Sequence, residues 1–140
     1  MNDWRKHDWA AVPLRLAAGI ILFVAGYQKL MAIDNTVAYF AKLGFPVPVV
    51  TGWFIALLEF FGGAALIVGL FVSYLGLIFT IEFIVATFLV KLPGVGYAQS
   101  RLDIMILATA AALYLLGAGP WSIDSVSLYK KRGVRAKEPD

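Results

Sequence analysis

Ionisable side chains placed inside long apolar stretches are the residues of this chain best suited to chemistry. Glu59 and Glu82 each lie near the middle of such a stretch, while Arg15 and Lys29 lie towards the two ends of another. If these stretches cross a membrane, each isolated charge costs ~2.5–3.5 kcal/mol on insertion scales, so it needs a partner or a task. A carboxyl group there can exchange protons, and a nearby cation can stabilise negative charge on a bound molecule. Lys29, Glu59 and Glu82 are therefore the candidate catalytic residues, and together with Arg15 they are the candidates for polar pairing.

A second polar group is expected where the third apolar stretch is connected to the fourth. Lys91, Arg101 and Asp103 border a short connection that contains proline and glycine. One interpretation is a set of exposed ion pairs at the membrane surface. The other is a shallow pocket in which Lys29 and Asp103 flank a small polar or quinone-like headgroup, since small-ligand sites combine apolar walls with a few convergent polar groups.

Composition excludes several kinds of site. The chain has no cysteine, which rules out disulfides, iron–sulfur ligation and cysteine–zinc sites. The single histidine, His7, lies in the polar N-terminal segment, so this chain alone cannot hold a haem between two imidazoles. We predict no metal site and no intrinsic cofactor. The net charge of +3 is attributed to membrane topology, and no nucleic-acid partner is expected.

The apolar stretches are long enough to hold these residues within a bilayer. Hydrophobic residues make up 61% of the 140, well above the ~45–50% of ordinary soluble domains. A spanning helix needs about 20 apolar residues, and four stretches meet or approach that length, at 12–31, 50–71, 74–90 and 102–117. The sequence therefore predicts an all-α fold, in which residues 1–140 form one integral membrane domain, an antiparallel four-helix transmembrane bundle in the lipid bilayer.

A short interfacial helix is predicted in the first outer loop, between the first two spans. Asp34 or Asn35 can cap a helix that begins near Thr36. Gly44 is placed to end it, because glycine readily adopts the left-handed conformation that follows a helix. An apolar stripe at helical spacing suggests that this helix lies on the rim of the bundle or in the headgroup layer.

Positive charge predicts the orientation of the bundle. An even number of spans places both termini on one side of the membrane. That side carries Arg5, Lys6, Arg15 and the basic tail at 124–140. Because positively charged segments are retained in the cytoplasm, we expect both termini to be cytoplasmic.

Helical spacing also predicts how the first two spans meet. One face of the first span carries two cations and two glycines, namely Arg15, Gly19, Gly26 and Lys29. Glu59 and Gly63 share a face of the second span. Glycines let two helices approach closely in a membrane, so these faces are expected to pack together, with Glu59 bonded to Arg15 or Lys29. No basic residue lies at the depth of Glu82 on its own helix, and we expect Glu82 to bond to another helix, to accept protons or to contact another subunit.

Four short motifs carry a resemblance to a known family. They are GYQKL at 26–30, LGFPVP at 43–48, LEFFGG at 58–63 and GAGPWSID at 117–124. In this order and spacing they resemble the DoxX family of small four-span bacterial membrane proteins, over roughly 14–124. The resemblance implies a multi-pass protein of the bacterial cytoplasmic (inner) membrane that is associated with an oxidoreductase. DoxD-like subunits, which are related, belong to thiosulfate:quinone oxidoreductase, and other members are linked to oxidative-stress complexes.

Two functions follow from the residues and the resemblance together. In the first, the protein is a membrane oxidoreductase subunit that binds quinone in the bundle, with Glu59 or Glu82 as proton acceptor and Lys29 or Arg15 stabilising negative charge. Since the chain has no redox group of its own, a soluble or membrane redox partner protein must supply the electrons. In the second, the protein is a non-catalytic scaffold or binding module that recruits a partner protein or forms a homo-oligomer. A transporter is disfavoured, because four spans would need to oligomerise to make a pathway.

Overall fold

The computed structural model describes residues 3–127, with side chains from residue 8 onward. This part of the chain consists of helices without strands, as predicted. They are α1 (Asp3–Met31), α2 (Ile33–Lys42), α3 (Pro48–Val68), α4 (Val72–Ile84), the π-helix η1 (Val85–Lys91), α5 (Leu92–Val95) and α6 (Tyr97–Leu116). The side chains of Arg5, Lys6 and His7, and the tail at 128–140, lie outside the described residues.

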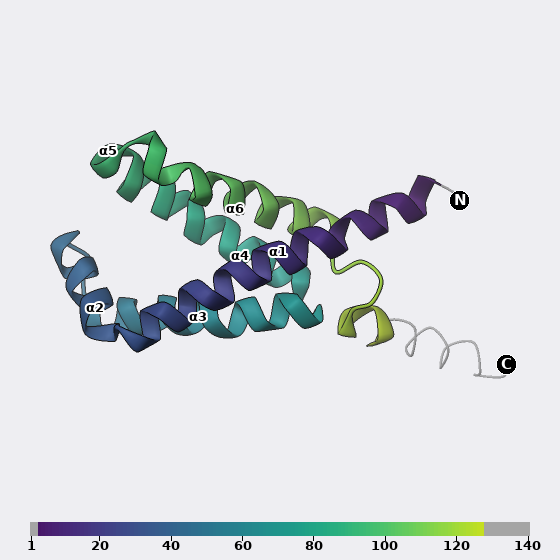
Figure 1. Cartoon of the computed structure of the whole chain (residues 1–140), viewed down its shortest axis with the longest axis horizontal. Coiled ribbons are helices and arrows are strands. Elements are labelled where there is room, and N and C mark those ends of the chain that lie inside the picture. Colours follow the sequence, from purple (N-terminus) through teal and green to yellow (C-terminus); the bar gives the residue numbers. More distant parts are fainter. Residues whose placement is uncertain (1–2, 128–140) are drawn as a thin grey trace, which may run out of the picture.

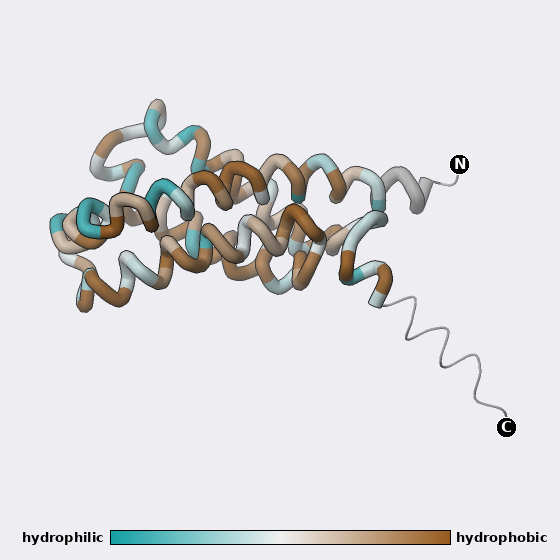
Figure 2. The backbone as a smooth tube through the Cα atoms, turned by 60° about the horizontal axis from the view of Figure 1, so that its bottom comes forward, coloured by the Kyte–Doolittle hydropathy of each residue, from teal (hydrophilic) through white to brown (hydrophobic). Residues whose placement is uncertain are grey.

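Four of the helical segments are long and apolar enough to cross a membrane: Asp8–Met31, Pro48–Val68, Val72–Val95 and Tyr97–Leu116. They confirm the number and order of the predicted spans. Apolar residues dominate along all four segments in Figure 2. The chain is therefore a multi-pass membrane protein whose long helices lie in the lipid bilayer.

The four spans pack as two pairs. We call α1 with α3 the first arm, and α4, η1 and α6 the second arm. The two arms meet near the turn between α3 and α4 and diverge towards the end that carries α2 and α5, as Figure 1 shows. This divergence leaves room between the arms at the α2 end.

Close packing of α1 on α3 depends on glycine, as the helix faces predicted. A Cβ atom added at Gly19 would lie 2.9 Å from the carbonyl oxygen of Gly63, and one at Gly26 would overlap the backbone of Phe60. The rings of Phe23 and Phe60 then stack at a centroid distance of 4.7 Å. Lys29 lies three residues after Gly26, and Glu59 lies four residues before Gly63. The contact between the two helices therefore fixes the position of Lys29 relative to Glu59.

The short helix α2 begins earlier than predicted. It starts at Ile33, directly after α1, and its N-cap is Ala32, which makes no side-chain capping bond. Asp34 and Asn35 therefore lie within the helix, and the prediction that one of them caps it was wrong. The predicted end is confirmed: Gly44 has φ +76°, and the Phe45 amide donates to the Phe40 carbonyl oxygen at 3.2 Å, which is the Schellman pattern.

The third span is longer than predicted and changes its helical pitch. After α4 the chain forms the π-helix η1, and α5 carries the helix on to Val95. Pro93 fits in the first turn of α5, where the missing amide hydrogen costs no bond. Gly96, with φ +80°, is the break, so α6 begins at Tyr97 rather than near 102. Asp103 consequently lies in the second turn of α6 and not at its start.

The end of the bundle opposite α2 is closed by the segment that follows α6. The amides of Phe71 and Val72, at the start of α4, donate to the two carboxylate oxygens of Asp124 at 3.0 Å each. The Asp124 amide in turn donates to the carbonyl oxygen of Gly69 at 3.1 Å. Asp124 had been assigned to the basic tail, but its carboxylate caps the first amides of α4 from another segment, while the N-cap residue itself is Phe71.

Candidate ligand-binding cavity

A cavity of about 830 Å³ lies between the two arms. Its walls come from α1, α3, α4, η1 and α6, and residues of α2 and of the segment after it also line it. Most lining side chains are aliphatic or aromatic. The ionisable side chains among them are Lys29, Glu59, Glu82, Lys91 and Asp103. Five of the residues singled out from the sequence therefore line one cavity.

Lys29 and Glu59 form an ion pair within the first arm. The Lys29 ammonium group, from the last turn of α1, donates a hydrogen bond to Glu59 Oε2, from the middle of α3. The Glu59 side chain is only 5% exposed, whereas that of Lys29 is 33% exposed. Pairing offsets much of the cost of a carboxylate at this depth. The sequence left two cations open for Glu59, and the structure selects Lys29.

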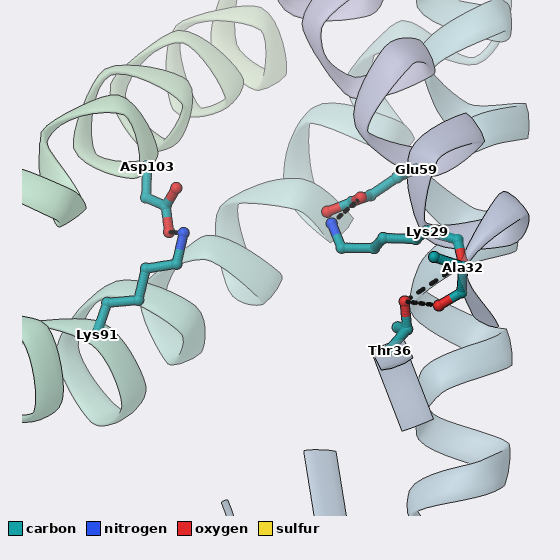
Figure 3. Close-up of polar contacts among 6 residues, drawn as sticks. All are labelled: Lys29, Ala32, Thr36, Glu59, Lys91 and Asp103. Atoms are coloured by element: carbon teal, nitrogen blue, oxygen red, sulfur yellow. Dashed lines mark hydrogen bonds and ion pairs between the residues drawn. The ribbon is translucent and has the colours of Figure 1, made fainter. Parts of the chain in front are cut away.

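A second ion pair lies within the second arm. Lys91 Nζ, at the end of η1, is 2.6 Å from Asp103 Oδ2 on α6. Figure 3 shows the Lys91–Asp103 pair on one side of the site and the Lys29–Glu59 pair on the other, with the side chains of the two pairs extending towards one another. Each arm thus presents one ion pair to the cavity.

Glu82 is the third carboxyl group of the cavity. It comes from α4 and lines the same cavity as Glu59 on α3. Its Oε2 atom is buried and has no hydrogen-bond partner among the described residues. A buried oxygen without a partner is costly, and a donor group on a bound molecule would satisfy it.

Arg15 lies away from this cavity. Its guanidinium group donates to the carbonyl oxygens of Ala118, at 2.7 Å, and of Trp121. The side chain is buried at the closed end of the bundle, so it does not pair with Glu59. Arginine suits this place because its fork of donors can satisfy several carbonyl oxygens at once.

Arg101 was predicted in the outer polar group with Lys91 and Asp103. It is exposed on the first turns of α6 and does not line the cavity. The reason is the early start of α6, which turns position 101 away from the face that carries Asp103. The outer polar group is thus a pair of residues that face the cavity.

Several lining residues were not singled out from the sequence. Tyr39 and Phe40 of α2 and Phe45 after it cover the α2 end of the cavity, and Phe54 lines it from α3. The strong apolar stripe of α2 was the available signal, although it pointed to the rim of the bundle and not to a cover. Phe54 is one aromatic residue in a uniformly apolar helix, and no sequence signal distinguishes it.

The arrangement is suited to binding a ring-sized molecule with polar atoms at opposite edges. Two ammonium groups can donate hydrogen bonds to acceptor oxygens, while three carboxyl groups can accept bonds or exchange protons. Among the described residues there is no group of three or more histidine, aspartate or glutamate side chains that could hold a metal ion. The cavity volume lies within the ~300–1,000 Å³ of small-molecule sites.

Comparison with known proteins agrees with this architecture. A family model described as DoxX matches residues 10–92. The chain is 31% identical over 111 residues to "Putative oxidoreductase CatD" of Bacillus subtilis (strain 168), covering 79% of this chain and 81% of that protein. It is 32% identical over 85 residues to "Inner membrane protein YphA" of Escherichia coli (strain K12), covering 56% of this chain and 61% of that protein. No solved structure matches. The matched segment holds four of the five ionisable residues of the cavity, and the chain belongs to the DoxX family.

Proposed function

We propose that this protein is the membrane subunit of an oxidoreductase and binds a quinone in the cavity between its two arms. The observation that carries the proposal is the pair of facing ammonium groups, Lys29 and Lys91, in an otherwise apolar cavity of about 830 Å³. The two carbonyl oxygens of a quinone lie at opposite edges of its ring, and each needs one donor. The name of the Bacillus subtilis relative, a putative oxidoreductase, supports the same class of function.

The reaction would be the reduction of the quinone to its hydroquinone. The ring gains two electrons and two protons, and both carbonyl groups become hydroxyl groups. A soluble or membrane partner protein that carries a redox group supplies the electrons. Lys29 and Lys91 stabilise the negative charge that builds on the ring oxygens. Glu82 and Glu59, which line the same cavity, accept protons from water and pass them to the ring oxygens, and the hydroxyl groups of the product can donate to Glu82 Oε2.

The test is direct binding of decyl-ubiquinone to the purified protein in nanodiscs, followed by equilibrium dialysis. We expect about one molecule per chain, with a Kd raised at least tenfold in Lys29→Met and in Lys91→Met. Arg101→Met is the matched control, since it removes an exposed cation outside the cavity, and its Kd should stay within twofold. Protein that binds no quinone while it still co-purifies with a partner protein would overturn the proposal in favour of a scaffold. Equal Kd values for all three variants would also overturn it.

The orientation of the bundle belongs to the same proposal. Arg15 lies at the closed end of the bundle and the tail residues follow that end, so the positive-inside rule favours a cytoplasmic closed end and an outward-facing α2. In a bacterial inner membrane, a cysteine at exposed Asn35 should react in intact cells with a membrane-impermeant thiol reagent. If the reaction requires disrupted cells, the orientation is the reverse.

A further inference from the structure

A second, smaller hollow lies beside the main cavity, between the end of α1 and α2. Its volume is about 350 Å³. Polar side chains distinguish it from the main cavity, because Gln28, Asn35 and Thr36 line it. Ala25 and Lys29, together with the aromatic residues Tyr39 and Phe40, line both spaces. The two spaces therefore share a wall, and the ammonium-bearing side chain of Lys29 is part of that wall.

The two spaces open towards different surroundings. Gln28 and Asn35 are exposed polar residues at the α2 end of the bundle, where a membrane protein meets headgroups and water. The exposed residues of the main cavity include Phe54 on α3 and Ile81 on α4, which are 60% and 58% exposed. Apolar side chains exposed on spanning helices face hydrocarbon. The main cavity thus has exposed lining residues of the kind that face lipid, and the hollow has exposed lining residues of the kind that face water.

Lys29 lies between the hollow on the aqueous side and the buried carboxyl groups. One-third of its side chain is exposed, yet its ammonium group is bonded to Glu59, which is 5% exposed. Glu82 lines the same cavity as Glu59. The hollow, Lys29 and the two carboxyl groups therefore follow one another from the α2 surface to the middle of the bundle. Figure 3 shows part of this order: the Thr36 hydroxyl group lies at the Lys29 backbone, and the Lys29 ammonium group lies at Glu59.

We propose that the hollow between α1 and α2 is the aqueous mouth of the cavity, through which water and protons reach Glu59 and Glu82 past Lys29. The molecule in the main cavity enters separately, from the hydrocarbon between α3 and α4. This inference rests on the proposed function for the use of the protons, since reduction of a quinone consumes two. It adds that they come from the side of the membrane that α2 faces.

The absence of cysteine from the whole chain makes thiol labelling a clean test, because each introduced cysteine is the only one. Only the thiolate reacts, and it forms only where water reaches the side chain. Single variants Asn35→Cys, Ala25→Cys and Leu58→Cys sample the hollow, the shared wall and the main cavity. Phe61→Cys is the lipid-facing control, because Phe61 is 62% exposed on α3 and lines neither space. The protein in nanodiscs is treated with a charged methanethiosulfonate reagent, and the mass increase is followed over time.

We expect Asn35→Cys to react fastest and Ala25→Cys and Leu58→Cys to react at least tenfold faster than Phe61→Cys. Adding Thr36→Trp, which fills the hollow, should slow Ala25→Cys and Leu58→Cys at least fivefold and leave Phe61→Cys unchanged. The inference is overturned if Leu58→Cys is as slow as Phe61→Cys, or if Thr36→Trp has no effect, because water would then be absent or enter elsewhere. No quinone is present in this assay, so its result is separate from that of the binding test. If the protein binds quinone but the cavity cysteines do not react, only the inference of an aqueous mouth is overturned. If the cavity cysteines react but the protein binds no quinone, only the proposed ligand is overturned.

Discussion

Lys91 and Asp103 hold the π-helical part of the third span against the fourth span, with 2.6 Å between Lys91 Nζ and Asp103 Oδ2. The Asp103 side chain is 8% exposed and that of Lys91 is 35% exposed. The carboxylate therefore depends on this one ammonium group for compensation. The π-helix contributes to the geometry, because its wider turn changes the direction in which position 91 points relative to an α-helix.

Removing this ammonium group should destabilise the second arm. Lys91→Met leaves Asp103 buried and unpaired, which we expect to cost on the order of 1–3 kcal/mol, less than a fully buried pair because Lys91 is partly exposed. Unfolding in sodium dodecyl sulfate measures the change. The double variant Lys91→Met/Asp103→Asn should recover most of the loss, and Arg101→Met should cause none. A double variant as unstable as the single one would contradict the pairing.

The contact between α1 and α3 should not tolerate a methyl group at Gly26. A Cβ atom there would overlap the backbone of Phe60, and backbone atoms cannot move aside as a flexible side chain can. We expect Gly26→Ala to lower the free energy of unfolding by about 2 kcal/mol or more. Gly94→Ala is the matched control, because a Cβ atom there meets nothing within 4 Å. Equal stabilities of the two variants would show that the helices are not in close contact.

The capping of α4 by Asp124 gives a graded prediction. Asp124→Ala removes both acceptors of the Phe71 and Val72 amides and should cost about 0.5–2 kcal/mol, as for other N-caps. Asp124→Asn retains one acceptor and should fall between the wild type and Asp124→Ala. Asp34→Ala removes an exposed carboxylate that makes no capping bond. Its stability, measured by thermal unfolding in detergent, should therefore be close to that of the wild type. A larger loss for Asp34→Ala than for Asp124→Ala would refute the cap.

Thr87 offers a substitution that should not harm the protein. Its side chain is fully buried in η1, and its hydroxyl group has no hydrogen-bond partner among the described residues. Thr87→Val keeps the shape and removes the unsatisfied hydroxyl, so we expect unchanged stability or a gain of up to about 1 kcal/mol. Thr80→Val, which removes a hydroxyl that donates to the Gly76 carbonyl oxygen at 2.6 Å, is the comparison and should be less favourable. If the Thr87 variant loses more, its hydroxyl has a partner in the membrane.

The sequence was sufficient for the spans and for the contact between α1 and α3. Length and hydropathy reveal spanning helices because the bilayer imposes both, and Gly26 and Gly63 marked a face because helical spacing is regular. The choice of Lys29 for Glu59 could not be made in this way, since both cations lie on the same face. Arg15 binds carbonyl oxygens of residues more than 100 positions away. Every residue has a backbone carbonyl group, so the residue types do not show which ones accept these bonds.

The π-helix and the start of α6 at Tyr97 also could not be predicted from the sequence. In a span that is apolar on every side, a change from i+4 to i+5 bonding shifts no hydrophobic period, so nothing marks Val85–Lys91. Pro93 and Gly94 suggested a loop, although a proline in the first turn of a helix is compatible with helix formation. The candidate residues could be identified from their residue types. Their grouping around one cavity could not be predicted, because it depends on how the two arms diverge.

The attachment of Arg15 to Ala118 and Trp121 has a consequence for biosynthesis. A residue in the first span to leave the ribosome finds its partners only in the segment that follows the last span. Until these residues are made, the guanidinium group lacks the carbonyl oxygens that it binds in the folded protein. We therefore expect the closed end of the bundle to form only after residues 118–124 have been synthesised.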